Sequence, residues 1–191
     1  PQGVNAVELA AELVAKLRGL ARRKREEGPF DDGFDIPHST VHVGRIEGGT
    51  AVNIVPRECW FDFEVRHLPG DDALALIAEV QRYAEEALLP EMRAVDPEAG
   101  FAWHRMSHIP GLDTGPDDAV TALATALSGA NATGKVAFGT EGGLFQGAGV
   151  PTIVCGPGSI AQAHKPDEFI AVEQVARCEQ FMRRLMDRAA Q

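Results

Sequence analysis

The chain has 191 residues and a formal net charge of −10, with 45% hydrophobic and 24% charged residues. This length and ordinary composition exclude a disordered, collagen-like or repeat protein and are typical of one or two globular domains. The acidic balance argues against nucleic acid as the main partner. No apolar run approaches the ~18 residues that span a bilayer, so we expect no membrane-spanning segment. The three cysteines are widely spaced, which fits a cytoplasmic protein better than a disulfide framework.

The first predicted element is an amphipathic helix that ends at Gly28-Pro29. Acidic Glu8 near its start and the basic run Arg22–Arg25 near its end both suit the helix dipole. This run is better explained as a solvated helix end than as a nucleic-acid patch. Apolar residues recur at steps of three and four: Val4, Val7, Ala10, Val14, Leu17 and Ala21.

Three extended segments follow a loop rich in Gly, Pro and Asp. The segments 41–46 and 50–55 flank Gly48-Gly49, a pair that predicts a hairpin turn. The third segment, 59–67, alternates apolar with charged residues, which is the period of a half-buried strand.

A turn at Leu68–Asp71, with Asp71 as the helix cap, leads into a second predicted helix that stops near Pro90. Residues 101–106 are predicted to form a last strand. The order of elements resembles a ferredoxin-like β-α-β-β-α-β arrangement whose first strand is missing. We therefore expect residues 1–108 to be one domain, and residue 1 to be an internal position of a longer protein.

The second half alternates helices and strands, which predicts α/β layers. Expected helices run from about residue 117 to Leu127 and from Val172 to Ala190, and expected strands are 135–138 and 151–155. The fully apolar 151–155 segment predicts burial on both faces of a parallel sheet. Because so few strands cannot form a sheet alone, residues 109–191 are predicted to be the C-terminal portion of an α/β domain. The overall fold class is therefore α/β plus α+β.

His164 lies in a Gly/Pro-rich loop after this apolar strand, where α/β sheets carry their ligands. From the residues alone, a metal ligand, a base and a structural role remain open for it. A triad with Ser159 and Asp167 is disfavoured, because Ser159 lacks the Gly-x-Ser-x-Gly elbow. We expect Cys155 to be a buried thiol and Glu141 to cap a short helix.

Arg66 shares a strand face with Asp62 and Glu64. It either forms an exposed salt bridge or grips a substrate carboxylate through its planar fork. With 50–55 as a strand, Asn53 should stand ~13 Å from Arg66 along the ribbon, too far to hold the same small group. The remaining five histidines lack metal-binding spacing and are interpreted as surface or turn residues.

Two long segments resemble the acetylornithine deacetylase family of two-metal amide hydrolases. They are GPFDDGFDIPHSTVHVGRIEGGTAVNIVPRECWFDFEVRHLPG and GTEGGLFQGAGVPTIVCGPGSIAQAHKPDEFI. They are more loosely similar to succinyl-diaminopimelate desuccinylase, aminoacylase and glutamate carboxypeptidase. The stretch GPGSIAQAHKPDEF is the most specific and favours acetylornithine deacetylase.

The resemblance implies a ferredoxin-like lid, which commonly forms a homodimer, inserted in a catalytic α/β domain that holds two zinc or cobalt ions. It implies removal of the acetyl group from N-acetylornithine, in arginine biosynthesis. By residue, it implies that His164 is a metal ligand, that Arg66 binds the substrate carboxylate and that Asn53 reaches a reaction centre, often the partner's. Thr140 and Gly142 match a loop that lines the substrate pocket.

The family's other metal ligands and its general base belong to an N-terminal stretch that this sequence does not contain. One imidazole cannot hold a catalytic zinc, so we expect this chain alone to be inactive and to bind metal weakly at most. Two alternatives stay open. One is a different acyl group, as in a desuccinylase or an aminoacylase, and the other is a non-catalytic dimerisation module.

Overall fold

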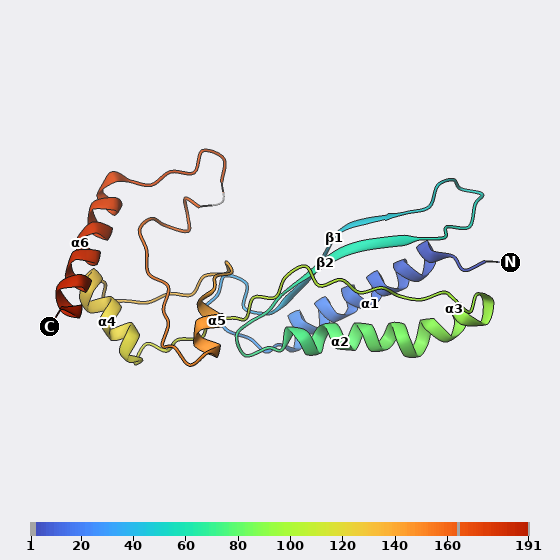
Figure 1. Ribbon diagram of the computed structural model, residues 1–191, viewed down its shortest axis with the longest axis horizontal. Helices are drawn as coiled ribbons and strands as arrows, with labels where there is room; N and C mark the ends of the chain where they lie inside the picture. The colour runs from blue at the N-terminus through green and yellow to red at the C-terminus, as the bar shows by residue number, and fades with distance from the viewer. Residues whose placement is uncertain (1–2, 164, 191) are drawn as a thin grey trace. The chain divides into compact units, whose positions relative to one another are not determined.

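The first helix, α1, spans Ala6–Glu27 in the computed structural model, which describes residues 3–163 and 165–190 (Figure 1). The side chain of Asn5 caps it by accepting hydrogen bonds from the N–H groups of Val7 and Glu8 at 3.1 and 3.3 Å. Gly28 ends it in a positive-φ conformation, as the sequence predicts. The chain divides into two compact units, Pro1–His108 and Ile109–Gln191.

The buried face of α1 shares Ala10 and Leu17 with the predicted stripe and otherwise differs from it. The residues that enter the core form the row Leu9, Leu13, Leu17 and Leu20, together with Ala10. Val7, Val14 and Ala21 lie beside this row and are only half-buried. Two apolar stripes run side by side on this helix, and packing against the ribbon and α2 decides which of them is buried.

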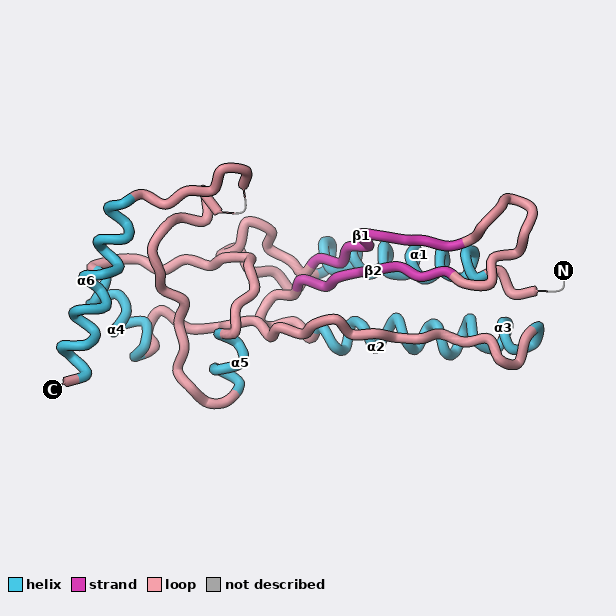
Figure 2. The backbone as a smooth tube through the Cα atoms, turned by 45° about the horizontal axis from the view of Figure 1, so that its top comes forward, coloured by secondary structure: helices cyan, strands magenta, loops and turns pink. Residues whose placement is uncertain are grey.

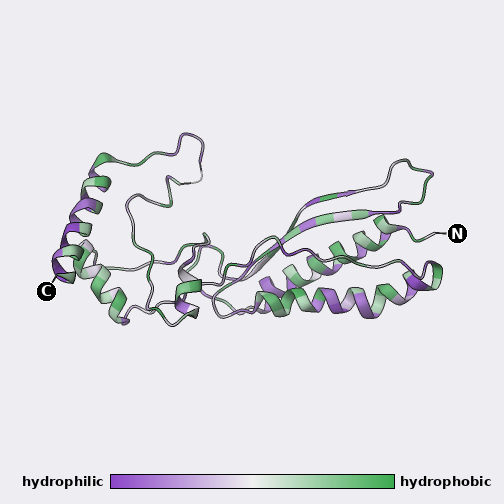
Figure 3. Cartoon of the chain, viewed as in Figure 1, coloured by the Kyte–Doolittle hydropathy of each residue, from purple (hydrophilic) through white to green (hydrophobic). Residues whose placement is uncertain are grey.

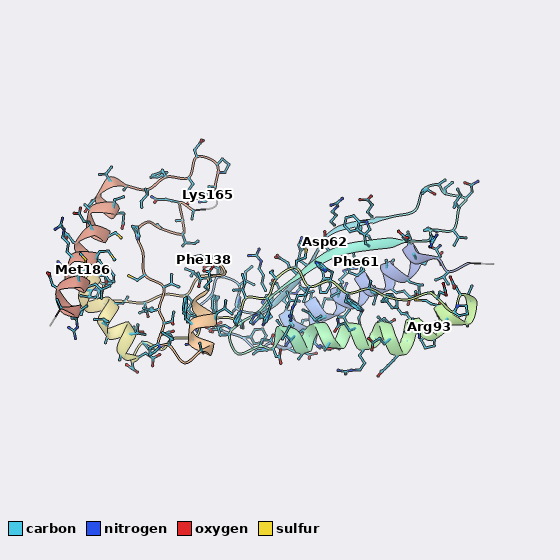
Figure 4. All side chains as sticks on the ribbon, in the orientation of Figure 1. Phe61, Asp62, Arg93, Phe138, Lys165 and Met186 are labelled. Carbon is cyan, nitrogen blue, oxygen red and sulfur yellow. The ribbon has the colours of Figure 1, made fainter. Side chains whose placement is uncertain are left out.

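Unit 1 contains a two-stranded antiparallel ribbon, made of β1 (Thr40–Gly48) and β2 (Cys59–Arg66) (Figure 2). Thr40 pairs with Arg66 at one end and Gly48 with Cys59 at the other, with a bulge between Val43 and Arg45. Along β2, half-buried and exposed residues alternate, as for Phe61 and Asp62, which Figure 4 labels.

The predicted strand at 50–55 is wrong, because residues 49–58 form a loop. β1 pairs instead with β2, whose alternate residues Phe61, Phe63 and Val65 pack against the helices. Residues 50–55 bring no comparable apolar face to β1, and Val52 is fully exposed. β1 does end at Gly48, where a Cβ would lie 2.7 Å from the Sγ of its ladder partner Cys59.

The second helix, α2 (Ala73–Tyr83), is capped by Asp72 rather than by Asp71. Oδ1 of Asp72 accepts hydrogen bonds from the N–H groups of Leu74 and Ala75 at 2.9 and 3.0 Å. The helix also does not stop near Pro90. A π-helical turn, η1 (Ala84–Leu88), continues into α3 (Leu89–Val95) with Pro90 in its first turn, where the missing N–H of proline is tolerated.

The core of unit 1 lies where α1 meets the ribbon and α2. In Figures 1 and 2, α1 lies against the ribbon and α2 lies beside α1. Leu17 and Val80 are 1% and 0% exposed at its centre. Residues 101–106 do not form the predicted strand. Phe101 and Trp103 nevertheless pack against the core, although no described strand hydrogen-bonds this segment into the sheet.

Unit 2 contains three helices in the part of the chain described: α4 (Ala119–Ser128), α5 (Gly142–Gly147) and α6 (Val172–Ala189). α4 packs against α6, and Nη1 of Arg184 donates to the carbonyl of Leu127 at 2.9 Å. Hydrophobic and hydrophilic residues are interspersed along α6, and many of its apolar side chains are exposed (Figure 3).

The predicted strands at 135–138 and 151–155 are also wrong, since all of these residues are in loops. A parallel strand needs neighbouring strands to satisfy its backbone groups, and the described residues of unit 2 supply none. None of the described helices is long and apolar enough to cross a membrane.

Ion pairs link α1 to the segment that contains α2. Glu79 of α2 accepts hydrogen bonds from Arg23 at 3.1 Å and approaches Nζ of Lys16 at 3.0 Å. The Arg23 hydrogen bond lowers the pKa of Glu79 from 4.5 to about 2, against the effect of burial and with help from Lys16. Two residues of the predicted basic run, Arg23 and Lys24, therefore stabilise the fold of unit 1.

We predict that Glu79 makes unit 1 acid-sensitive. The native pKa lies below the unfolded one, so this stabilisation is present above about pH 5 and is lost as pH falls towards 2. Glu79→Gln should lower the free energy of unfolding by about 1–2 kcal/mol at pH 7, a figure reduced for partial exposure. Urea unfolding at several pH values between 7 and 2.5 measures the free energy of unfolding of both proteins. The difference between wild type and Glu79→Gln should shrink as the pH falls. The exposed Glu86→Gln is the control, and a difference that stays constant with pH contradicts this account.

Candidate substrate-binding site

Arg66 is the last residue of β2 and points to the exposed face of the ribbon. Its Nε donates to Oε1 of Glu64 at 2.9 Å, and its Nη2 donates to Oε2 at 3.4 Å. The two side chains are 64% and 51% exposed. The hydrogen bond to Glu64 raises the pKa of Arg66 above its ordinary value, so the guanidinium is a permanent cation open to solvent. The exposed strand salt bridge is thus present, and one edge of the guanidinium stays available to a carboxylate.

Asn53 lies in the exposed loop 49–58, beyond the opposite end of the ribbon. Seven residue steps separate Cys59 from Arg66 along β2, which is about 23 Å at about 3.3 Å per residue. Asn53 is therefore farther from Arg66 than the predicted ~13 Å, because 50–55 is not a strand folded back on the ribbon. Within one chain, these two side chains are not brought together.

His164, the predicted metal ligand, lies outside the described residues. Among residues 3–163 and 165–190, no group of three His, Cys, Asp or Glu side chains converges as metal ligands would. The residues described here therefore do not fit a catalytic metal centre, which needs about three protein ligands.

Thr140 and Gly142 lie together at the start of α5. Oγ1 of Thr140 accepts a hydrogen bond from the N–H of Gly142 at 3.1 Å. Gly142 is buried, and a Cβ there would approach Leu112 to 3.0 Å. This geometry corrects the predicted role of Glu141, which occupies the cap position without a side-chain capping hydrogen bond. The Thr140 hydroxyl supplies that bond instead.

The next residue of the helix is the most crowded glycine of unit 2. A Cβ on Gly143 would lie 2.1 Å from the carbonyl oxygen of Pro110, so no larger residue fits there. The side chain of Gln146 also clamps Asp113, accepting from its N–H at 3.0 Å and donating to its carbonyl at 2.7 Å. The loop 139–143 is thus held firmly by its neighbours in unit 2. The sequence shows only a glycine-rich run here and gives no signal for Gln146.

Comparison with known proteins places this geometry in context. Residues 1–92 match the peptidase dimerisation domain family. The chain is 32% identical over 188 residues to an acetylornithine deacetylase from Myxococcus xanthus, covering 95% of this chain and 46% of that protein. It is 35% identical over 169 residues to one from Erwinia tasmaniensis, covering 88% and 42%. The chain thus spans about half the length of the curated relatives it matches, and the resemblance to acetylornithine deacetylases is confirmed.

A solved structure shares the fold. The crystal structure of aminopeptidase PepT from Bacillus cereus superposes with a TM-score of 0.60 at 24% identity, covering 94% of this chain and 44% of that one. At this identity the match supports the architecture and says nothing of the substrate.

Cys155 is exposed, which contradicts the predicted buried thiol. Cys59 is half-buried, and burial raises the pKa of its thiol. We predict that a thiol reagent such as DTNB modifies Cys155 about tenfold faster than Cys59 at pH 7.5, because only an accessible thiolate reacts quickly. Cys155→Ser should remove the fast phase, whereas Cys59→Ser should leave it unchanged. A fast phase that survives Cys155→Ser refutes the exposed position.

Proposed function

We propose that this chain is part of a metal-dependent amide hydrolase that deacetylates N-acetylornithine, because residues 1–92 match the peptidase dimerisation domain family and the whole chain resembles acetylornithine deacetylases. In this proposal residues 1–108 are the lid and dimerisation domain, and residues 109–191 are part of the catalytic domain. The observation that carries the proposal is the alignment with the Myxococcus xanthus enzyme over 95% of the chain.

Arg66 binds the substrate carboxylate in this proposal. Glu64 occupies the Nε and Nη2 donors on one edge of the guanidinium. Further N–H donors on Nη1 and Nη2 remain, and their planar geometry matches a carboxylate. Glu64 holds the fork in one orientation, so the substrate does not have to order it. The neighbouring negative charge weakens carboxylate binding and favours a substrate that also carries a cation, as the ornithine side chain does.

Asn53 belongs to a different active site in the same proposal. The length of the ribbon prevents Asn53 and Arg66 of one chain from touching one small substrate. We assign Asn53 to the reaction centre of a second copy in a homodimer formed through residues 1–92, which match a dimerisation domain. Each active site of the dimer then contains residues from both chains.

Two zinc or cobalt ions are the proposed cofactors, with His164 as one ligand. Such ions polarise the amide carbonyl and lower the pKa of a bound water when they are present. The described residues do not form a metal centre, so the remaining ligands and the general base are assigned to residues outside this chain. Thr140 and Gly142 are proposed to line the substrate pocket through the firmly held start of α5.

One alternative is a non-catalytic dimerisation module, which the match of residues 1–92 to a dimerisation domain favours. Light scattering on residues 1–108 tests dimerisation directly, and a monomer at high concentration excludes this alternative. A desuccinylase or a general aminoacylase would keep the hydrolase chemistry and change the acyl group. The proposal requires a longer protein. Its rates of turnover of N-succinyl and N-acetyl substrates distinguish these activities.

We predict that this 191-residue chain alone does not hydrolyse N-acetylornithine and that the longer protein does. There, Arg66→Ala should lower kcat/KM about 100-fold, mainly through KM, since a bidentate charged contact is lost. Arg45→Ala is the matched control, because Arg45 is a similarly exposed strand arginine, 3.0 Å from Glu47. Initial rates of acetate release measure both variants. Equal effects of the two substitutions, or turnover by the short chain, contradict the proposal.

A further inference from the structure

A buried polar cluster lies at the end of the ribbon that carries Arg66. Nζ of Lys24, in the last turn of α1, lies 2.8 Å from Oδ1 of Asp71, in the turn before α2. The two side chains are only 12% and 9% exposed, whereas Arg66 and Glu64 are more than half exposed. This ion pair is therefore built into unit 1 and is shielded from solvent.

Ser39 completes this cluster from the segment just before β1. Its side chain is fully buried, and its Oγ accepts a hydrogen bond from the N–H of Leu68 at 3.1 Å. The N–H of Asp71 donates to the carbonyl of Leu68 at 2.9 Å, which closes the turn. Burial would raise the pKa of Asp71, but Lys24, with a contribution from the nearby Ser39, outweighs burial and holds that pKa below its ordinary value. Oδ2 of Asp71 is buried and has no hydrogen-bond partner among the described residues.

The cluster contacts the chain close to Arg66 on β2 and close to its ladder partner on β1. Ser39 directly precedes Thr40, the ladder partner of Arg66, and Leu68 follows Arg66 by two residues. The cluster thus ties together the start of β1, the chain after β2, the end of α1 and the turn before α2. A buried ion pair is weak evidence for stability, because apolar residues of similar volume often serve as well. A polar cluster restricts the positions of its residues more than apolar packing does. Here it fixes the position of the end of β2, where Arg66 lies.

We propose that Ser39, Lys24 and Asp71 are positioning residues that set the place of Arg66 for binding the substrate carboxylate. This inference rests on the proposed function of Arg66. None of the three is assigned contact with the substrate. They act through the backbone of residues 66–68, and an arginine displaced by even 1 Å would lose much of a bidentate contact.

The test uses the longer, catalytically active protein with the variants Ser39→Ala and Asp71→Asn, each alone and combined with Arg66→Ala. The substrates are N-acetylornithine and its derivative with the α-carboxylate replaced by a carboxamide. Each cluster variant should raise KM for the carboxylate substrate about tenfold with kcat within about twofold, and should leave the carboxamide unaffected. In the Arg66→Ala background, neither variant should have a further effect.

Asp72→Ala is the matched control for lost stability. It removes the cap of α2 one residue away without touching the cluster, and its KM values should match wild type. Lys24→Arg preserves the charge and should retain most of the affinity. Hydrogen exchange on the 191-residue chain gives a second measurement, in which Ser39→Ala should speed exchange of the Leu68 amide about tenfold.

The outcomes separate the two proposals. If Arg66→Ala leaves the preference for the carboxylate over the carboxamide substrate unchanged, the proposed role of Arg66 is wrong. The positioning inference then fails with it. If Arg66→Ala abolishes that preference, two results overturn the positioning role alone. One is a wild-type KM in both cluster variants, and the other is an equal rise in KM for Asp72→Ala.

Discussion

Burial of one face of α1 against the ribbon and α2 is the interaction on which unit 1 depends. Leu17 and Val80 lose nearly all solvent contact at its centre, and Phe61 and Phe63 of β2 pack around it. A two-stranded ribbon alone is at best marginally stable in water. The ribbon keeps its register because its inner face is apolar and packed, so the place of every outward-facing residue follows from that burial.

This constraint explains how unit 1 presents polar groups at fixed positions. The inner face of the ribbon contributes aromatic and branched residues to the core, and the outer face of β2 carries the charged residues Asp62, Glu64 and Arg66 after Trp60. Arg66 stands at one end beside a buried polar cluster, and Asn53 stands past the other end in an exposed loop. A rigid spacer between two functional groups suits a protein whose active sites are shared between two copies, as proposed above.

The sequence predicts the elements of unit 1 better than their contacts. The charge pattern and Gly28-Pro29 place α1 correctly even without Asn5, because these signals are local. The sequence pattern predicts Leu17 as a buried residue but not Leu9 or Leu13, because a second apolar stripe runs beside their row and packing against the ribbon decides which stripe is covered. The strand at 50–55 failed for a similar reason, since β2 competes for the same partner with a better apolar face.

The polar cluster and unit 2 show where local patterns stop being informative. Asp71 and Asp72 are adjacent and equally able to cap a helix, and the buried Lys24 selects between them. Strands at 135–138 and 151–155 were inferred from apolar runs, but a strand also needs partners, which the described residues of unit 2 lack. For the candidate site, side-chain chemistry alone suggests Arg66, and this role stays a prediction, whereas its separation from Asn53 follows from the strand ladder.

The most direct test of the central claim is hydrogen exchange of the β1–β2 amides in the 191-residue chain carrying Leu17→Ala. Leu17 is in α1 and makes no ladder hydrogen bond, yet the account predicts a loss of about 3 kcal/mol in the free energy of unfolding and a matching loss of ribbon protection. Leu74→Ala, on an exposed part of α2, should cost less than about 1 kcal/mol. Ribbon amides that stay fully protected in Leu17→Ala would contradict the account.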